Sequence, residues 1–157
     1  MEIVIVLVLV SLRGLLVLGE ITLLTAKRSW LESEKIKGNI NAAIAIRLLD
    51  NIDSYFSAMQ ICAAFISIIV GAYAGVAIGH QLEPVVSLFP TLAPYAAQIS
   101  IVLVITAITY LSLIVGEIAP KYIAIQHAER LAIVLVPTMS FVTRITEPIS
   151  TFLKWSA

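Results

Sequence analysis

The segment from Gly116 to Lys121, which reads GEIAPK, places several groups that can bind a cation next to one another. Pro120 has no backbone N–H, so in a helix it cannot donate to the carbonyl oxygen of Gly116, four residues earlier. That carbonyl and the Glu117 carboxylate are the kind of oxygen ligand that Mg²⁺ or Na⁺ prefers, and broken transporter helices use freed carbonyls in this way. The alternative interpretation is a kinked helix end at which Glu117 pairs with Lys121.

Two charged residues, Arg13 and Glu20, interrupt an apolar run near the start of the chain. They are seven residues apart, so in a helix they would lie on the same side, roughly 10 Å apart along the axis. A charge at membrane depth costs at least ~2.5 kcal/mol, so each side chain should face protein, water or a partner. One interpretation is structural, with an ion pair or an Arg13 that snorkels outward. The other is a polar pocket for a cation, lined by both side chains.

The run 55–79 carries no charge and supplies fewer candidate ligands. The Ser67 hydroxyl is one, although lone serines in spanning helices usually bond to the preceding backbone turn. Gly71, Gly75 and Gly79 recur every four residues, a pattern that favours close approach of another helix, from this domain or from a second copy. The candidate cation ligands are therefore Glu20, Ser67, Gly116 and Glu117. The residues with an expected structural role are Arg13, Gly71, Gly75, Pro120 and Lys121.

Several other classes of function find no support in these residues. His80 and His127 have no third ligand at metal-site spacing. We find no nucleophile–base arrangement, Gly-rich phosphate loop or pair of catalytic carboxylates, so we expect no enzyme and no cofactor besides a transported ion. The formal net charge is zero, which gives no reason to expect nucleic-acid binding.

The elements that must position these residues are membrane-spanning helices. Hydrophobic residues make up 60% of the 157-residue chain and charged residues 13%, and the mean hydropathy is +1.01. Three charge-poor runs, at about 3–26, 55–79 and 96–117, approach or exceed the ~20 residues that a spanning helix needs. We therefore predict an all-α membrane fold with three transmembrane helices, formed by residues 1–157 as a single domain.

The basic residues predict the orientation of these helices. The connection 27–53 carries five Lys or Arg residues, the tail after residue 117 carries four, and the connection 80–95 carries none. Because basic residues near membrane ends stay in the cytoplasm, we expect the N-terminus outside and the C-terminus inside. We predict that 27–53 is a helical cytoplasmic loop and that 121–157 forms juxtamembrane or interfacial helices. A fourth span at 131–155 is the rival interpretation, although its central charges would be costly.

The order of these motifs resembles the transmembrane domain shared by CorC-type magnesium and cobalt efflux proteins and the cyclin M (CNNM) transporters. The resemblance covers nearly the whole chain and is most specific in the Gly-Glu-x-x-Pro-Lys motif. The matching segments are 19–24, 26–28, 38–39, 55–61 with Gly71, 116–121, and 129–132 with Pro137.

This resemblance implies three spanning helices with a juxtamembrane helix, arranged as a homodimer in a bacterial or archaeal plasma membrane. It implies magnesium export, with sodium as a proposed exchanged ion, through a site of short polar side chains on the first two spans and oxygens near the Gly-Glu of the third. Two positions that are often polar in relatives are Val17 and Ala63 here, and Arg13 stands where a small polar residue is common. The expected ion site is therefore partly altered.

Relatives in this family typically continue into a cytoplasmic pair of nucleotide-binding CBS modules. The sequence ends at Ala157 without them. We therefore expect either a truncated piece of a longer protein or a stand-alone membrane domain without that regulation, which a separate cytoplasmic subunit could supply. The second functional hypothesis is a non-transporting membrane interaction or regulatory module, in which Arg13 and a carboxylate, Glu20 or Glu117, form a permanent internal ion pair.

Overall fold

The computed structural model describes residues 1–156, apart from the side chains at positions 150, 153 and 154, and these residues form helices and turns without a β-strand. In chain order the elements are α1 (Glu2–Thr25), α2 (Arg28–Ile36), α3 (Ile40–Asp50), α4 (Ile52–Val86), a short 3₁₀ turn (Ala93–Tyr95), α5 (Ala96–Leu113), the π-helical turn η2 (Ile114–Ile118) and α6 (Ala119–Ser156).

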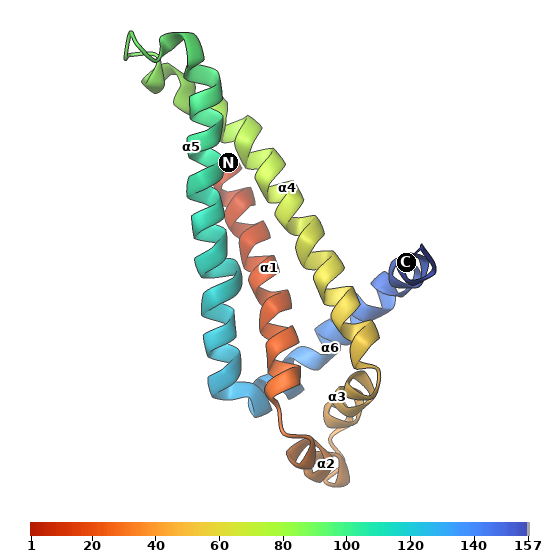
Figure 1. Cartoon of the computed structure of the whole chain (residues 1–157). Coiled ribbons are helices and arrows are strands. Elements are labelled where there is room, and N and C mark those ends of the chain that lie inside the picture. The colour runs from red at the N-terminus through yellow and green to blue at the C-terminus, as the bar shows by residue number, and fades with distance from the viewer. Residues whose placement is uncertain (157) are drawn as a thin grey trace.

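Three of these helices are long and apolar enough to cross a membrane, as the sequence predicted. They are α1, α4 and the stretch that contains α5. Figure 1 shows them side by side, with α1 between α4 and α5. Their side chains face hydrocarbon at low cost, and a helix satisfies its own backbone hydrogen bonds, which lipid cannot do.

Helix α4 is longer than the predicted span 55–79. It continues to Val86 and includes Pro84, which we had placed in the loop that follows. A proline so close to the end of a helix removes one backbone donor, and its usual acceptor would be the carbonyl of His80, at the exposed end of α4. Ser87 caps the end of the helix, and its hydroxyl donates to the carbonyl of Pro84 at 2.8 Å.

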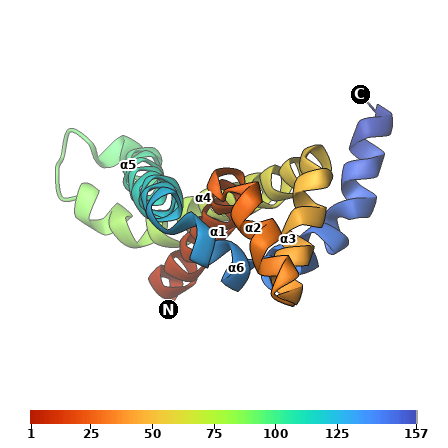
Figure 2. The same ribbon diagram turned by 90° about the horizontal axis from the view of Figure 1, so that it is seen from below.

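Helix α6 follows η2 directly, and its sharpest bend is at His127 (φ −128°, ψ 27°) rather than at Pro120. Figures 1 and 2 show α6 crossing the lower end of the bundle, where it packs against α1 and α4, and ending at the side of α4 with the C-terminus. In the described residues the third candidate span is one continuous stretch, Ala93–Ile149, and no separate fourth candidate follows it. The interfacial placement of the last part of α6 stays a prediction.

Buried side chains from all six α-helices form one hydrophobic cluster, and part of it lies at the end of the bundle near α2 and α3. Tyr55 and Met59 of α4 are fully buried there, and Met139 of α6 is almost so. They pack with Leu23 of α1 and Ala42 of α3 in the same cluster. This cluster fixes α6 against α1 and α4, so the position of η2 between α5 and α6 is fixed as well.

A side-chain hydrogen bond connects α3 to α6 where a proline interrupts α6. Pro137 cannot donate to the carbonyl of Ile133, four residues earlier. The Nδ2 of Asn41 donates to that carbonyl instead, at 3.1 Å. Asn39, the N-cap of α3, orders the start of the same helix by accepting from the N–H groups of Asn41 and Ala42.

We expect Asn41→Leu to lower the free energy of unfolding by about 1–3 kcal/mol, because it leaves the Ile133 carbonyl without a donor in a partly buried place. Thermal unfolding in detergent would measure the loss. The matched control is Asn51→Leu, since the Asn51 amide donates only locally to the carbonyl of Arg47 on an exposed surface. An equal loss in both variants would contradict the role assigned to Asn41.

Candidate functional site

The carboxylate of Glu117 lies between two cationic side chains. Its Oε2 is 3.0 Å from Nη2 of Arg13, and its Oε1 is 2.9 Å from Nζ of Lys121. Arg13 also donates from Nη1 to the carbonyl oxygen of Ser112 at 3.2 Å and to its hydroxyl at 3.4 Å. Both oxygens of Glu117 are therefore ion-paired, and Arg13 connects α1 to Ser112 at the end of α5 and to Glu117 within η2.

The turn that carries Glu117 is a π-helical turn rather than a simple kink. The N–H of Ala119 donates to the carbonyl of Ile114, five residues earlier, instead of to that of Val115. The other possible helical donor to Val115 would be Pro120, which has no N–H. The carbonyls of both Val115 and Gly116 therefore lack their ordinary helical donor, whereas the sequence had indicated only Gly116. Such turns are frequent at functional sites.

Two glycines let α1 approach this turn closely enough for Arg13 to reach Glu117. A Cβ atom on Gly14 would lie 2.9 Å from the carbonyl oxygen of Val115 and 3.1 Å from Cγ of Pro120. A Cβ atom on Gly116 would lie 3.3 Å from Nη1 of Arg13 and 3.4 Å from the carbonyl oxygen of Val10. Side chains at these positions would hold α1 and η2 farther apart.

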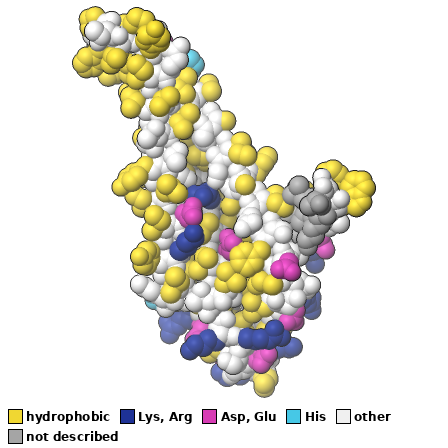
Figure 3. All heavy atoms as spheres, viewed as in Figure 1, with side chains coloured by type: hydrophobic (Ala, Val, Ile, Leu, Met, Phe, Trp, Pro, Cys, Tyr) yellow, Lys and Arg dark blue, Asp and Glu magenta, His cyan; other side chains and the backbone are white. Residues whose placement is uncertain are grey.

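A cavity of about 360 Å³ lies beside this cluster, between α1, α4 and the start of α6. Glu20 lies on its wall, and among the described residues it makes no hydrogen bond or ion pair, so its carboxylate stays available to a ligand. Figure 3 shows a small group of acidic and basic side chains halfway along the bundle, surrounded by hydrophobic ones. The residues that line the cavity are Arg13, Val17, Glu20, Ile21, Gln60, Ala63, Ala64, Ser67, Glu117 and Lys121.

The structure brings together most of the residues that the sequence singled out. Glu20, Ser67, Glu117, Arg13 and Lys121 all line this cavity, and Gly116 is buried next to Glu117. The hydroxyl of Ser67 donates to the carbonyl of Ala63 at 2.8 Å, the local bond typical of serine in a spanning helix. Its oxygen keeps lone pairs that can still accept.

The glycine stripe on α4 is divided between two surroundings. Gly75 and Gly79 face α5: Cβ atoms there would lie 3.1 Å from Cδ1 of Ile105 and 2.9 Å from Cγ1 of Ile101, respectively. Nothing lies within 4 Å of a Cβ atom on Gly71. The close helix approach thus occurs within this domain at two of the three glycines, and Gly71 borders open space.

Sequence reasoning missed the contribution of Ser112. This residue is buried, and both its carbonyl and its hydroxyl accept from Arg13. The available signal was its position five residues before Glu117 on the same run, which a π-helical turn places on the same face. The side chain of Gln60, on α4, also lines the cavity.

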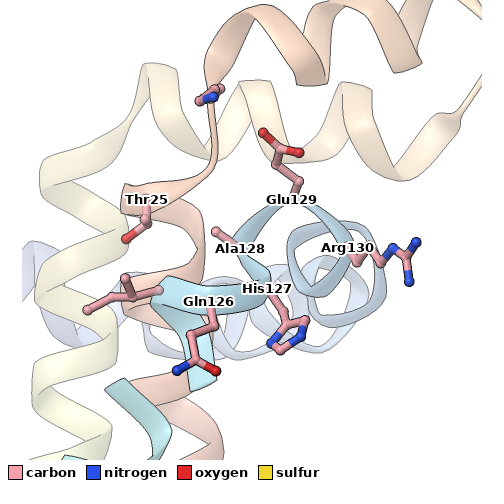
Figure 4. Close-up of a pocket in the computed structure, with 8 residues that line it drawn as sticks. Thr25, Gln126, His127, Ala128, Glu129 and Arg130 are labelled. Carbon is pink, nitrogen blue, oxygen red and sulfur yellow. The ribbon is translucent and has the colours of Figure 1, made fainter. Parts of the chain in front are cut away.

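A second polar cavity of about 390 Å³ lies at the bend of α6 and contains none of the predicted ligands. Figure 4 shows it between the end of α1 at Thr25 and the bend at His127, with Glu129 and Arg130 pointing in different directions. Its lining side chains are mostly exposed, in contrast to the cluster around Glu117. The cavity beside Glu117 is therefore the better candidate site.

Comparison with known proteins gives a match over almost the whole chain. Residues 3–157 match the family described as the cyclin M transmembrane N-terminal domain. The chain is 38% identical over 149 residues to the UPF0053 protein sll0260 of Synechocystis sp., covering 95% of this chain and 33% of that protein. It is 30% identical over 128 residues to the UPF0053 protein YhdT of Bacillus subtilis, covering 82% of this chain and 28% of that protein.

The UPF0053 protein YhdP of Bacillus subtilis is 29% identical over 157 residues, covering 99% of this chain and 35% of that protein. The chain thus spans about a third of the length of the curated relatives it matches. No solved structure matches it.

Proposed function

This chain belongs to the cyclin M transmembrane domain family, and we propose on that basis that it is a membrane cation transport domain with a partly altered ion site. The observation that carries the proposal is the cavity in which Glu20, Gln60, Ser67 and Glu117 present oxygens at membrane depth. Ionisable residues inside spanning segments are costly and usually serve ion or proton pathways. Mg²⁺ and Na⁺ are the candidate ions, since both prefer oxygen ligands.

Binding of an ion in this cavity would require little rearrangement at first. The carboxylate of Glu20 lines the cavity and makes no hydrogen bond or ion pair with the described residues. Each oxygen of Glu117 keeps a lone pair, but Arg13 and Lys121 already balance its charge, so we expect it to bind an ion strongly only when Arg13 moves off Oε2. Lys121 would then continue to balance its charge. Transport thus involves separation of α1 from η2.

The proposal is tested by cation flux in proteoliposomes. We expect wild-type protein to carry Na⁺ or Mg²⁺. We expect Glu20→Gln to reduce the rate by about tenfold or more, because it removes the charge of the cavity carboxylate that has no ion pair with the described residues. Gln81→Ala is the matched control, since Gln81 lies near the opposite end of α4 and pairs with Glu2. Absence of flux of either ion in the wild type would reject transport.

A second candidate function is a non-transporting interaction or regulatory module. The specific observation in its favour is that both oxygens of Glu117 are ion-paired, which is how a permanently closed site would look. This alternative expects no flux and a large loss of stability when Arg13 is removed. Flux and stability of the same variants therefore separate the two functions.

We extend the proposal to the surroundings of the domain. The side chains of Arg13 and Glu117 are 17% and 31% exposed, and lipid tails cannot solvate them. We propose that a second copy of the chain, in a homodimer, covers these two side chains.

We also place the end with α2 and α3 in the cytoplasm, where Figure 3 shows basic and acidic side chains gathered. Regulation would come from cytoplasmic domains or a separate subunit.

A further inference from the structure

Arg13 lies at the boundary between two cavities. The larger one, of about 360 Å³, extends from Arg13 toward the α2 and α3 end of the bundle and contains Glu20. The smaller one, of about 150 Å³, extends toward the opposite end and is bordered by Gly71 and Thr109. Of the described residues, only Arg13 and Ser67 line both. The guanidinium group therefore lies beside an ion in either cavity.

The guanidinium is held in this position by contacts with the third span. Its Nη2 is 3.0 Å from Oε2 of Glu117, and its Nη1 donates to the carbonyl and hydroxyl oxygens of Ser112. Its exposed fraction is 17%, so little solvent screens its charge. A fixed, poorly screened positive charge raises the electrostatic energy of any cation beside it.

The charges around the larger cavity already balance. Arg13 and Lys121 carry two positive charges, and Glu20 and Glu117 carry two negative ones. An incoming monovalent ion therefore adds one unbalanced charge, and a divalent ion adds two. Because Coulomb energy is proportional to the product of the charges, Arg13 repels a divalent ion twice as strongly as a monovalent one at the same distance.

We propose that Arg13 is a specificity-determining residue that restricts this site to monovalent cations, of which Na⁺ is the representative probe. The inference rests on the proposed function, because it names the class of ion that the transport site accepts. The guanidinium is a fixed positive charge, and it takes the place of one of the two charges that a divalent ion would bring. Without it the same oxygens, from Glu20 and Glu117, would leave a net negative site that suits a divalent ion.

The test compares Arg13→Gln, which removes the charge but keeps a polar side chain, with Arg13→Lys, which keeps the charge. Binding of Na⁺ and of Mg²⁺ to the detergent-purified chain is measured by calorimetry, with circular dichroism as the folding check. We expect wild type and Arg13→Lys to bind Na⁺ and to bind Mg²⁺ at least about tenfold more weakly. We expect Arg13→Gln to bind Mg²⁺ about tenfold or more tightly than wild type does.

The outcomes separate this inference from the proposed function. Wild type that binds Mg²⁺ as tightly as Na⁺ overturns the inference without need of any variant, so a poorly folded Arg13→Gln would not prevent a decision. A folded Arg13→Gln that gains no Mg²⁺ affinity also overturns it. Absence of flux in proteoliposomes, together with the expected gain in Mg²⁺ binding by Arg13→Gln, would reject transport. It would still support the role of Arg13 in selecting monovalent ions. Absence of any ion binding overturns both.

Discussion

Glu117→Ala is expected to destabilise the domain by about 3 kcal/mol, the largest effect of any change in the cluster. The substitution removes the carboxylate that is ion-paired with both Arg13 and Lys121. Lys121 is 43% exposed and its long side chain can turn toward water, but Arg13 is 17% exposed and keeps only the Ser112 oxygens. An unpaired, poorly solvated guanidinium at membrane depth is the source of the loss. Unfolding in detergent, followed by tryptophan fluorescence, measures it.

The control removes the other member of the ion pair, Arg13. Arg13→Leu leaves Glu117 paired with Lys121, so we expect a smaller loss, of about 1 kcal/mol. The double variant Arg13→Leu with Glu117→Leu should be more stable than Glu117→Ala alone, because replacing both members of a buried pair by apolar groups is often neutral. A single Arg13→Leu variant that loses as much stability as Glu117→Ala would show that Lys121 does not compensate Glu117.

The sequence predicted the membrane fold well because lipid leaves few alternatives. Runs of about 20 apolar residues must form helices in hydrocarbon, so α1, α4 and α5 follow from composition alone. The end of α4 was harder to predict. Pro84 is a helix breaker in the interior of a helix but is tolerated in the last turn, where the lost hydrogen bond has an exposed acceptor.

The candidate site was predicted as a set of residues but not as a set of pairs. The i,i+4 pair of Glu117 and Lys121 is local, so spacing was enough to indicate it. Whether Arg13 reaches Glu20 or Glu117 depends on how α1 packs on the third span, which local spacing does not contain. Arg13 pairs with Glu117, because Gly14 and Gly116 bring the two segments together.

The π-helical turn could not be predicted from local preferences. Pro120 indicated that the helix would be disturbed, and the sequence led us to expect a free carbonyl at Gly116. The shift of the Ala119 N–H to the carbonyl of Ile114 also frees Val115, whose carbonyl faces Gly14 of α1. The turn packs against Gly14 of α1, and this tertiary contact is not contained in local sequence preferences.

Gly14→Ala is the second change with a large expected effect, a loss of about 2–3 kcal/mol in the free energy of unfolding. The added Cβ would lie 2.9 Å from the carbonyl oxygen of Val115, which belongs to the backbone of η2 and cannot rotate away as a side chain can. We expect α1 to move off the π-helical turn, which also lengthens the distance between Arg13 and Glu117. The variant should therefore lose stability and ion flux together.

Gly71→Ala is the matched control for this prediction, because it makes the same change in a spanning helix where nothing lies within 4 Å of the new Cβ. Alanine is a better helix former than glycine, so we expect Gly71→Ala to be neutral or to stabilise by about 0.5–1 kcal/mol. Gly71 lines the smaller cavity, which leaves room for the added methyl group. If Gly14→Ala were as stable as Gly71→Ala, close approach of α1 to η2 would not be what holds Arg13 on Glu117, and the pair would have to be maintained by its charges alone.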